Sequence, residues 1–248
     1  MQTPLDFYTL KARLSPALLA ILPLLITGIT FFPQYLTSWK SLYAIAVSCG
    51  LIYLLAELGR RAGTLKQEGL YKSWGGKPSV AMLRHRKTHN KALVAERHRK
   101  LTLLFPHLSL PSPEEERQNT KRADEIYEVL GESLKDRTRD KKTFPLLFQE
   151  NCSYGFWRNL WGLKPVGITT SLMALASILT LALRPAYFAS IDRKALIAPL
   201  ILDIGFLFVW IFWVTPKSIR VPAEAYAERL LEACDELIRQ AERQKPAK

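Results

Sequence analysis

The sequence predicts an all-α membrane protein with four transmembrane helices and a mainly helical, basic cytosolic domain. Two observations indicate this fold class. Apolar and charged residues are separated into blocks along the 248 residues, and most of the formal net charge of +13 lies in one block. Between Arg60 and Lys164 there are 22 Lys and Arg residues and 12 Asp and Glu residues, a difference of +10, so the positive charge belongs to a domain.

Four apolar runs approach the ~17–25 residues that a helix needs to cross a bilayer. None of them contains Lys or Arg, and Trp or Tyr residues, which favour the headgroup region, lie near their ends. The runs are Leu14–Phe32, Ser41–Leu58, Val166–Leu183 and Ala195–Val214. We therefore expect an N-terminal transmembrane hairpin (1–60), a basic cytosolic domain (61–165), a C-terminal transmembrane hairpin (166–216) and a cytosolic C-terminal helix (217–248).

The basic residues next to these runs predict the orientation of the chain. Lys11 and Arg13 precede the first run, and Arg60 and Arg61 follow the second. Because Lys and Arg gather on the cytosolic side of a membrane, both termini and the long loop are expected there. We therefore expect a multi-pass protein of a cell inner membrane, in contact with membrane lipids.

Three polar residues inside the runs are candidates for lining a pore. Asp203 lies near the middle of the fourth run, where a carboxylate costs about 2.5–3.5 kcal/mol on insertion scales, so it should face a bundle interior or a water-filled path. It either attracts cations or bonds to a Ser or Thr of a neighbouring helix. Thr170 and Ser177 are seven residues apart on one face of the third run and either line the path or pack helices together.

The segment from Tyr71 to Lys100 has nine Lys and Arg residues and one acid, Glu96. Such a surface attracts phosphates, so nucleic acid is one expected ligand; anionic lipid and plain solvent exposure are the alternatives. We expect helices beginning near Val80 and from about Asn90 to Leu104, with Met82, Leu83, Leu93, Val94, Leu101 and Leu104 turned inward. The candidate phosphate-binding residues are Trp74, Lys77, Arg84, Arg86, Lys87, Lys91, Arg97, Arg99 and Lys100.

Three further helices are expected outside the membrane runs. Ser112 and Pro113 are typical of a helix start, and that helix should continue toward Leu134. The segment Phe144–Trp161 is either an interfacial helix or part of a small cytosolic core. Near the C-terminus a seven-residue repeat predicts either a coiled coil that joins copies of the chain or packing on the chain's own cytosolic domain. Its seam is Ala223, Ala227, Leu230, Cys234, Leu237 and Ala241.

The sequence indicates no enzyme. It contains no nucleotide-binding, zinc-protease or hydrolase motif, so we expect no catalytic residues and no cofactor. His85 and His89 have the spacing of a helical metal pair, but no nearby carboxylate completes it, and the three cysteines are far apart. We therefore expect no metal site.

The layout resembles the small transmembrane effectors of bacterial antiphage systems, in particular the Hailong-type effectors. The resemblance covers the paired spans, a basic region with Trp74-Gly75-Gly76 and Leu83-Arg84-His85-Arg86, and an acidic-basic terminal helix. It implies an oligomeric channel or pore-forming effector in antiviral defence, regulated by an oligonucleotide or nucleotide, with a nucleotidyltransferase as partner. The alternative is a non-conducting membrane anchor or scaffold that binds a protein partner or acidic lipid.

Overall fold

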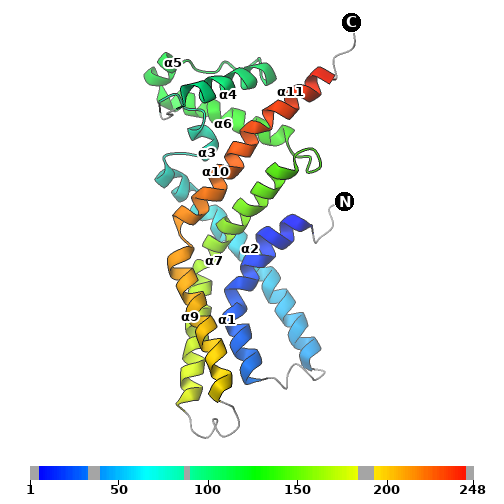
Figure 1. The fold of residues 1–248 in the computed structure, drawn as a ribbon, viewed down its shortest axis with the longest axis vertical. Coiled ribbons are helices and arrows are strands. Elements are labelled where there is room, and N and C mark those ends of the chain that lie inside the picture. The colour runs from blue at the N-terminus through cyan, green and yellow to red at the C-terminus, as the bar shows by residue number, and fades with distance from the viewer. Residues whose placement is uncertain (1–5, 33–39, 87–89, 184–192, 244–248) are drawn as a thin grey trace. The chain divides into compact units, whose positions relative to one another are not determined.

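The computed structural model of the chain describes residues 6–32, 40–86, 90–183 and 193–243, with the backbone alone described for 40–48 and 193 (Figure 1). Within these ranges every regular element is a helix, which confirms the all-α fold class. The chain divides into two compact units: unit 1 comprises residues 1–68 and 152–219, and unit 2 comprises 69–151 and 220–248. The two predicted hairpins thus fall in one unit, and the C-terminal helix shares a unit with the basic domain.

Unit 1 consists of long apolar helices. Its elements are the π-helical turn η1 (Thr9–Leu14), α1 (Ser15–Phe31), most of α2 (Lys40–Trp74), most of α7 (Pro145–Ala182), the 3-10 turn η3 (Arg193–Leu196), α9 (Ile197–Phe208), the π-helical turn η4 (Val209–Trp213) and the start of α10 (Pro216–Glu232). Helix α9 lies beside α1 (Figure 1).

Three helical segments of the described residues are long and apolar enough to cross a membrane: Thr9–Phe31, Pro145–Ala182 and Lys194–Trp213. They cover the first, third and fourth predicted runs except the last residue of each, and their length and hydropathy indicate a membrane protein. The second run, Ser41–Leu58, is helical as the first part of α2. The side chains at its start, up to residue 48, lie outside the described residues, so a fourth span remains a prediction.

Glycines let the helices of unit 1 pack with their backbones in contact. A Cβ atom added at Gly162 of α7 would lie 2.4 Å from the carbonyl oxygen of Gly59 in α2. A Cβ at Gly167 would lie 2.1 Å from the ring of Trp210. This ring is buried and packs directly against Gly167. Small residues at helix crossings are typical of membrane bundles, where close van der Waals contact holds helices together.

Two lysines of unit 1 are arranged as at a membrane–water boundary. The Lys66 and Lys164 ammonium groups lie 5.5 Å and 5.3 Å from the ring centroid of Trp161. Lys164 also donates hydrogen bonds to the carbonyl oxygens of Ile211 (3.0 Å) and Val214 (2.9 Å) where η4 ends. Tryptophan and long cationic side chains favour this depth because each has an apolar body and a polar tip.

Unit 2 is built from shorter helices: α3 (Pro78–Ala81), α4 (Lys91–Leu104), α5 (Pro113–Gln118), α6 (Thr120–Arg137) and α11 (Cys234–Arg243), with the ends of α2 and α10 and the start of α7. The predicted starts are confirmed, because Asn90 caps α4 and Ser112 forms a capping box with Glu115 at α5. The helix expected from Pro113 to Leu134 is instead two helices. The side chain of Asn119 accepts a hydrogen bond from the Arg122 N–H and starts α6.

The core of unit 2 contains most of the residues predicted to turn inward. Leu83, Val94, Leu101 and Leu104 are buried, and Met82 packs against them. Leu93 is 42% exposed, so that prediction was wrong. Val94, which was also predicted to turn inward, lies about 100° further round the helix and is buried.

The C-terminal repeat packs on the chain's own unit 2. Leu230, Cys234 and Leu237 are buried in the same core as Leu83 and Leu101. Lys100 of α4 forms a 2.6 Å ion pair with Asp235 of α11. Of the two interpretations of the repeat, the structure shows the intramolecular one, and these three positions are occupied within the chain.

The segment Phe144–Trp161 is not a separate interfacial helix. It belongs almost entirely to α7, a continuous helix of 38 residues that starts at Pro145. Phe144 and Leu147 lie in the core of unit 2, whereas Leu160 lies in the core of unit 1. The start of the segment is therefore part of a small core, the second of the two interpretations.

Candidate functional site

A carboxylate is enclosed within unit 1. Asp203 of α9 is 0% exposed, and its Oδ2 accepts a 2.8 Å hydrogen bond from the Thr27 hydroxyl of α1. Its Oδ1 is buried without a hydrogen-bond partner, and no Lys or Arg of the described residues forms an ion pair with it. The sequence predicted a bundle-facing Asp203 with a hydroxyl neighbour as one alternative, and the structure identifies that neighbour as Thr27.

A hollow of about 590 Å³ between α1 and α7 is lined in part by Thr27, the hydroxyl partner of Asp203. Its walls are mostly apolar, with hydroxyl groups from Thr27, Ser177 and Thr180. The hydroxyls of Ser177 and Thr180 donate to the carbonyl oxygens of Met173 and Ala176 on their own helix, so their oxygens can still accept a hydrogen bond. Thr27 is thus common to the hollow and to the Asp203 contact.

Thr170 and Ser177 have different surroundings although both lie on α7. Thr170 is 7% exposed, and its hydroxyl donates to the carbonyl oxygen of Ala20 in α1. Ser177 is exposed and lines the hollow. Thr170 therefore joins two helices, whereas the Ser177 hydroxyl remains available to line a conduction path.

Arg84 of the basic region is an internal structural residue of unit 2. It is 4% exposed, and its Nε and Nη2 donate to the two carboxylate oxygens of Asp124 at 2.8 Å and 2.9 Å. Its Nη1 donates to the carbonyl oxygen of Gly75 at 2.6 Å. A Cβ at Gly76, where φ is +131°, would lie 2.6 Å from Arg84 Nη2. The turn Trp74-Gly75-Gly76 is therefore shaped to receive this guanidinium.

Glu116 organises the segment after Arg84. It is 0% exposed and accepts hydrogen bonds from the backbone N–H of His85 (2.9 Å) and Arg86 (3.1 Å), the Arg86 guanidinium (2.9 Å) and the Tyr127 hydroxyl (2.8 Å). Burial opposes its ionisation, but these hydrogen bonds hold the pKa of Glu116 below its ordinary value. Burial and the bond to Glu116 raise the pKa of Tyr127.

Most of the other predicted phosphate-binding cations also have partners within the chain. Lys77 pairs with Glu128 and Glu132, Arg99 and Lys100 with Glu96, and the Arg97 guanidinium donates to the carbonyl oxygen of Met82. Lys91 is exposed and forms no ion pair with the described residues, Trp74 packs edge-on to Tyr71, and Lys87 lies outside the described residues. The surface therefore has fewer unpaired cations than its composition suggests.

His85, whose spacing to His89 is that of a helical metal pair, faces His98 in the structure. The rings of His85 and His98 are 4.5 Å apart, and His98 Nε2 lies 2.8 Å from the carbonyl oxygen of Leu83, to which it must donate. Burial lowers the pKa of His98, against the effect of that hydrogen bond. No group of three metal-ligating residues occurs in the described ranges, and His89 falls outside them.

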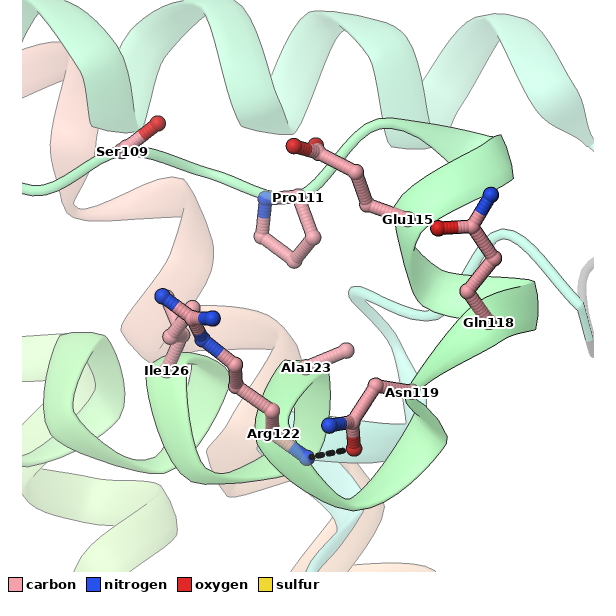
Figure 2. A pocket seen from close by; sticks show the side chains of 8 residues that line it. All are labelled: Ser109, Pro111, Glu115, Gln118, Asn119, Arg122, Ala123 and Ile126. Atoms are coloured by element: carbon pink, nitrogen blue, oxygen red, sulfur yellow. Dashed lines mark hydrogen bonds between the residues drawn. The ribbon is translucent and has the colours of Figure 1, made fainter.

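Unit 2 also contains a polar hollow of about 280 Å³ that the sequence did not reveal (Figure 2). Residues from the segment before α5, from α5 and from the start of α6 line it: Ser109, Pro111, Glu115, Gln118, Asn119, Arg122, Ala123 and Ile126. It depends on the change of direction at Asn119, which a single helix from Pro113 would not have produced. The one sequence signal for it was Asn119 itself, a residue type that favours helix starts.

Comparison of the chain with protein-family models, with curated proteins and with solved structures finds no match in any of the three. A functional assignment for this chain therefore starts from its own residues and their geometry.

Proposed function

We propose that the chain is a membrane channel or pore-forming effector, assembled from several copies, whose conduction path includes Asp203. In this proposal four helices cross a cell inner membrane, and both termini and unit 2 face the cytosol. The observation that carries the proposal is the Asp203 carboxylate, which is fully buried, holds one hydrogen bond and leaves Oδ1 without a partner.

A packing role alone would favour an apolar residue at position 203. A carboxylate near the middle of a span costs about 2.5–3.5 kcal/mol on insertion scales, and one hydrogen bond to a charged group returns about 1.5–3 kcal/mol. An apolar side chain would join α9 to α1 at lower cost. Ionisable groups at this depth are associated with ion and proton paths, so transport explains Asp203 better than packing does.

The hollow between α1 and α7 provides a route toward that carboxylate. Ser177 and Thr180 line it, and Thr27 connects it to Asp203. Because Asp203 has no exposed surface, conduction requires the contact between Thr27 and Asp203 to open. We propose that this hydrogen bond holds the closed state.

We further propose that an anionic ligand, with an oligonucleotide or nucleotide as the first candidate, regulates the path through unit 2. Lys91, which has no acidic partner in the described residues, supports this part of the proposal, and Arg99 of the same helix is 60% exposed although it pairs with Glu96. Arg84 and Arg86 are assigned a structural role because Asp124 and Glu116 neutralise them. A nucleotidyltransferase of an antiphage system would be the corresponding source of the ligand.

Liposome flux tests the conduction proposal. The purified chain is reconstituted with a trapped cation indicator, and Asp203→Asn, Thr27→Val and Thr30→Val are compared with the unchanged chain. Thr30 is the matched control, because its hydroxyl donates to the carbonyl oxygen of Ile26 one turn back on its own helix. We expect loss of flux in Asp203→Asn, raised flux in Thr27→Val and no change in Thr30→Val. Equal flux in all four proteins would contradict the assignment of Asp203.

Fluorescence anisotropy with a labelled single-stranded oligonucleotide tests the ligand proposal. Lys91→Glu with Arg99→Glu should weaken binding and reduce its salt dependence, because each phosphate contact releases counterions. Arg117→Glu is the control, since Arg117 is an exposed cation of α5 paired with Glu114. Equal affinity of the double variant and the unchanged chain would remove the proposed ligand surface. Arg84 is unsuitable for this test because its loss would disturb the fold.

The competing function is a non-conducting membrane anchor or scaffold that binds a protein partner or acidic lipid. The contact between Thr170 and Ala20 favours it, because it shows hydroxyl groups of these helices used for packing. A scaffold would insert into liposomes and give no flux under any ligand condition.

A further inference from the structure

The polar hollow of unit 2 has opposite charges on its two sides. Figure 2 shows the Glu115 carboxylate and the Arg122 guanidinium reaching the hollow from different elements, with the Pro111 ring between them. Arg122 makes no side-chain hydrogen bond or ion pair with the described residues, although its charge contributes to lowering the pKa of Glu115, after the larger effect of the Ser112 hydrogen bonds. The two groups therefore attract each other across the hollow without closing it.

The remaining lining completes a small binding site. Pro111, Ala123 and Ile126 give it an apolar floor, and the Gln118 and Asn119 amides and the Ser109 hydroxyl add polar groups. The Asn119 oxygen is already used by the Arg122 N–H (dashed in Figure 2), which leaves its amino group as a donor. Glu115 Oε2 accepts the Ser112 N–H at 2.7 Å, which leaves Oε1 as an acceptor.

Size restricts the ligand. The volume of about 280 Å³ lies just below the ~300–1,000 Å³ typical of pockets for drug-sized molecules. It is suited to a small metabolite, and an oligonucleotide could not be enclosed in it. A ligand here would therefore differ from the extended polyanion proposed for the surface near Lys91.

Charge restricts the ligand further. A simple anion that paired with Arg122 would face the Glu115 carboxylate, and a simple cation that paired with Glu115 would face Arg122. A molecule with an anionic group at one end and an ammonium group at the other satisfies both. The Arg122 guanidinium can donate two parallel N–H···O bonds to a carboxylate.

We propose that this hollow binds a small zwitterion of the amino-acid class, its carboxylate on Arg122 and its ammonium group on Glu115. The site lies entirely within unit 2, so it does not depend on conduction by the helices of unit 1. Binding can be measured with full-length protein in detergent whether or not that protein conducts.

The test is calorimetric titration of the detergent-purified full chain with each standard amino acid, and with inorganic phosphate and putrescine as single-sign probes. The variants are Arg122→Gln and Glu115→Gln. Glutamine at position 115 keeps the capping box with Ser112, so α5 should still form and only the charge is removed. Glu114→Gln and Arg117→Gln are matched controls, because they neutralise an exposed pair of the same helix that does not line the hollow.

At least one amino acid should bind, and each pocket variant should weaken its affinity by about 10-fold or more, as expected when a charge-assisted hydrogen bond is lost. The controls should bind as the unchanged chain does. Absence of binding by every amino acid would overturn the proposal. Phosphate binding that Glu115→Gln strengthens would overturn it too, in favour of a simple anion site.

Discussion

The hydroxyl of Thr27 in α1 donates a 2.8 Å hydrogen bond to the carboxylate of Asp203 in α9, and both side chains are buried. Removing the hydroxyl would leave both carboxylate oxygens without a partner. We therefore expect Thr27→Val, which keeps the shape of the side chain, to destabilise the detergent-solubilised protein by about 1–3 kcal/mol. Thermal unfolding measures this, with Thr30→Val as the control. Equal stability of the two variants would show that the contact contributes little.

The contact of Arg84 with Asp124 gives a second prediction. Arg84→Ala removes the hydrogen bonds of a buried guanidinium to Asp124 and Gly75, whereas Asp124, whose side chain is 30% exposed, keeps its contact with Arg86. We therefore expect Arg84→Ala to destabilise unit 2 by about 1–3 kcal/mol and to lower its midpoint of chemical unfolding, which can be followed by amide hydrogen exchange in α6. Arg117→Ala breaks an exposed pair of 71% and 68% exposure and should change little. Similar small effects of both variants would contradict a structural role for Arg84.

His98 should make unit 2 sensitive to mild acid. Burial lowers its pKa below the ordinary value of 6.5, so the unfolded chain binds more protons than the folded chain once the pH falls below that value. Stability is present above about pH 6.5 and is lost as the pH falls toward the pKa of the folded state. Glu116, whose pKa is held low, stays ionised in this range, and His85 is the other imidazole that faces His98.

The unfolding midpoint measured between about pH 7.5 and about pH 5.5 checks this direction. His98→Gln can still donate to the Leu83 carbonyl oxygen but does not titrate, so its midpoint should change less with pH. His107→Gln, at an exposed histidine, should follow the unchanged chain. An identical pH dependence in all three proteins would mean that His98 does not titrate between the two states.

Cysteine labelling tests the fourth span. Cys49 is exposed, whereas Cys152 and Cys234 are buried, and burial raises the pKa of Cys234 to about 12. If Ser41–Leu58 crosses the bilayer, lipid covers Cys49, and a charged maleimide should label it far more slowly than it labels Thr64→Cys further along α2. Equally fast labelling at the two positions in intact vesicles would place this segment in water.

Local features of the fold could be predicted from the sequence, because their causes are local. Ser112 and Asn90 cap the helices that they were expected to cap, and three of the four apolar runs meet the length and hydropathy of a span. The break at Asn119 was missed because asparagine is tolerated inside a helix as well as at its start.

The candidate sites could be predicted only in part, because distant residues form them. Asp203 was identified from its depth in an apolar run, but Thr27 is 176 residues away and no periodicity connects them. The same holds for Arg84 and Asp124, 40 residues apart. The number of charged residues showed an excess of Lys and Arg. It did not show which of these cations form ion pairs with Asp or Glu in the fold.

The reversal potential of the chain in a planar bilayer under a potassium chloride gradient tests the central claim most directly. A carboxylate in the conduction path attracts cations, so the unchanged chain should give a cation-selective potential, and Asp203→Asn should move it toward zero or abolish the current. A current with the same reversal potential in both proteins would show that ions do not pass Asp203.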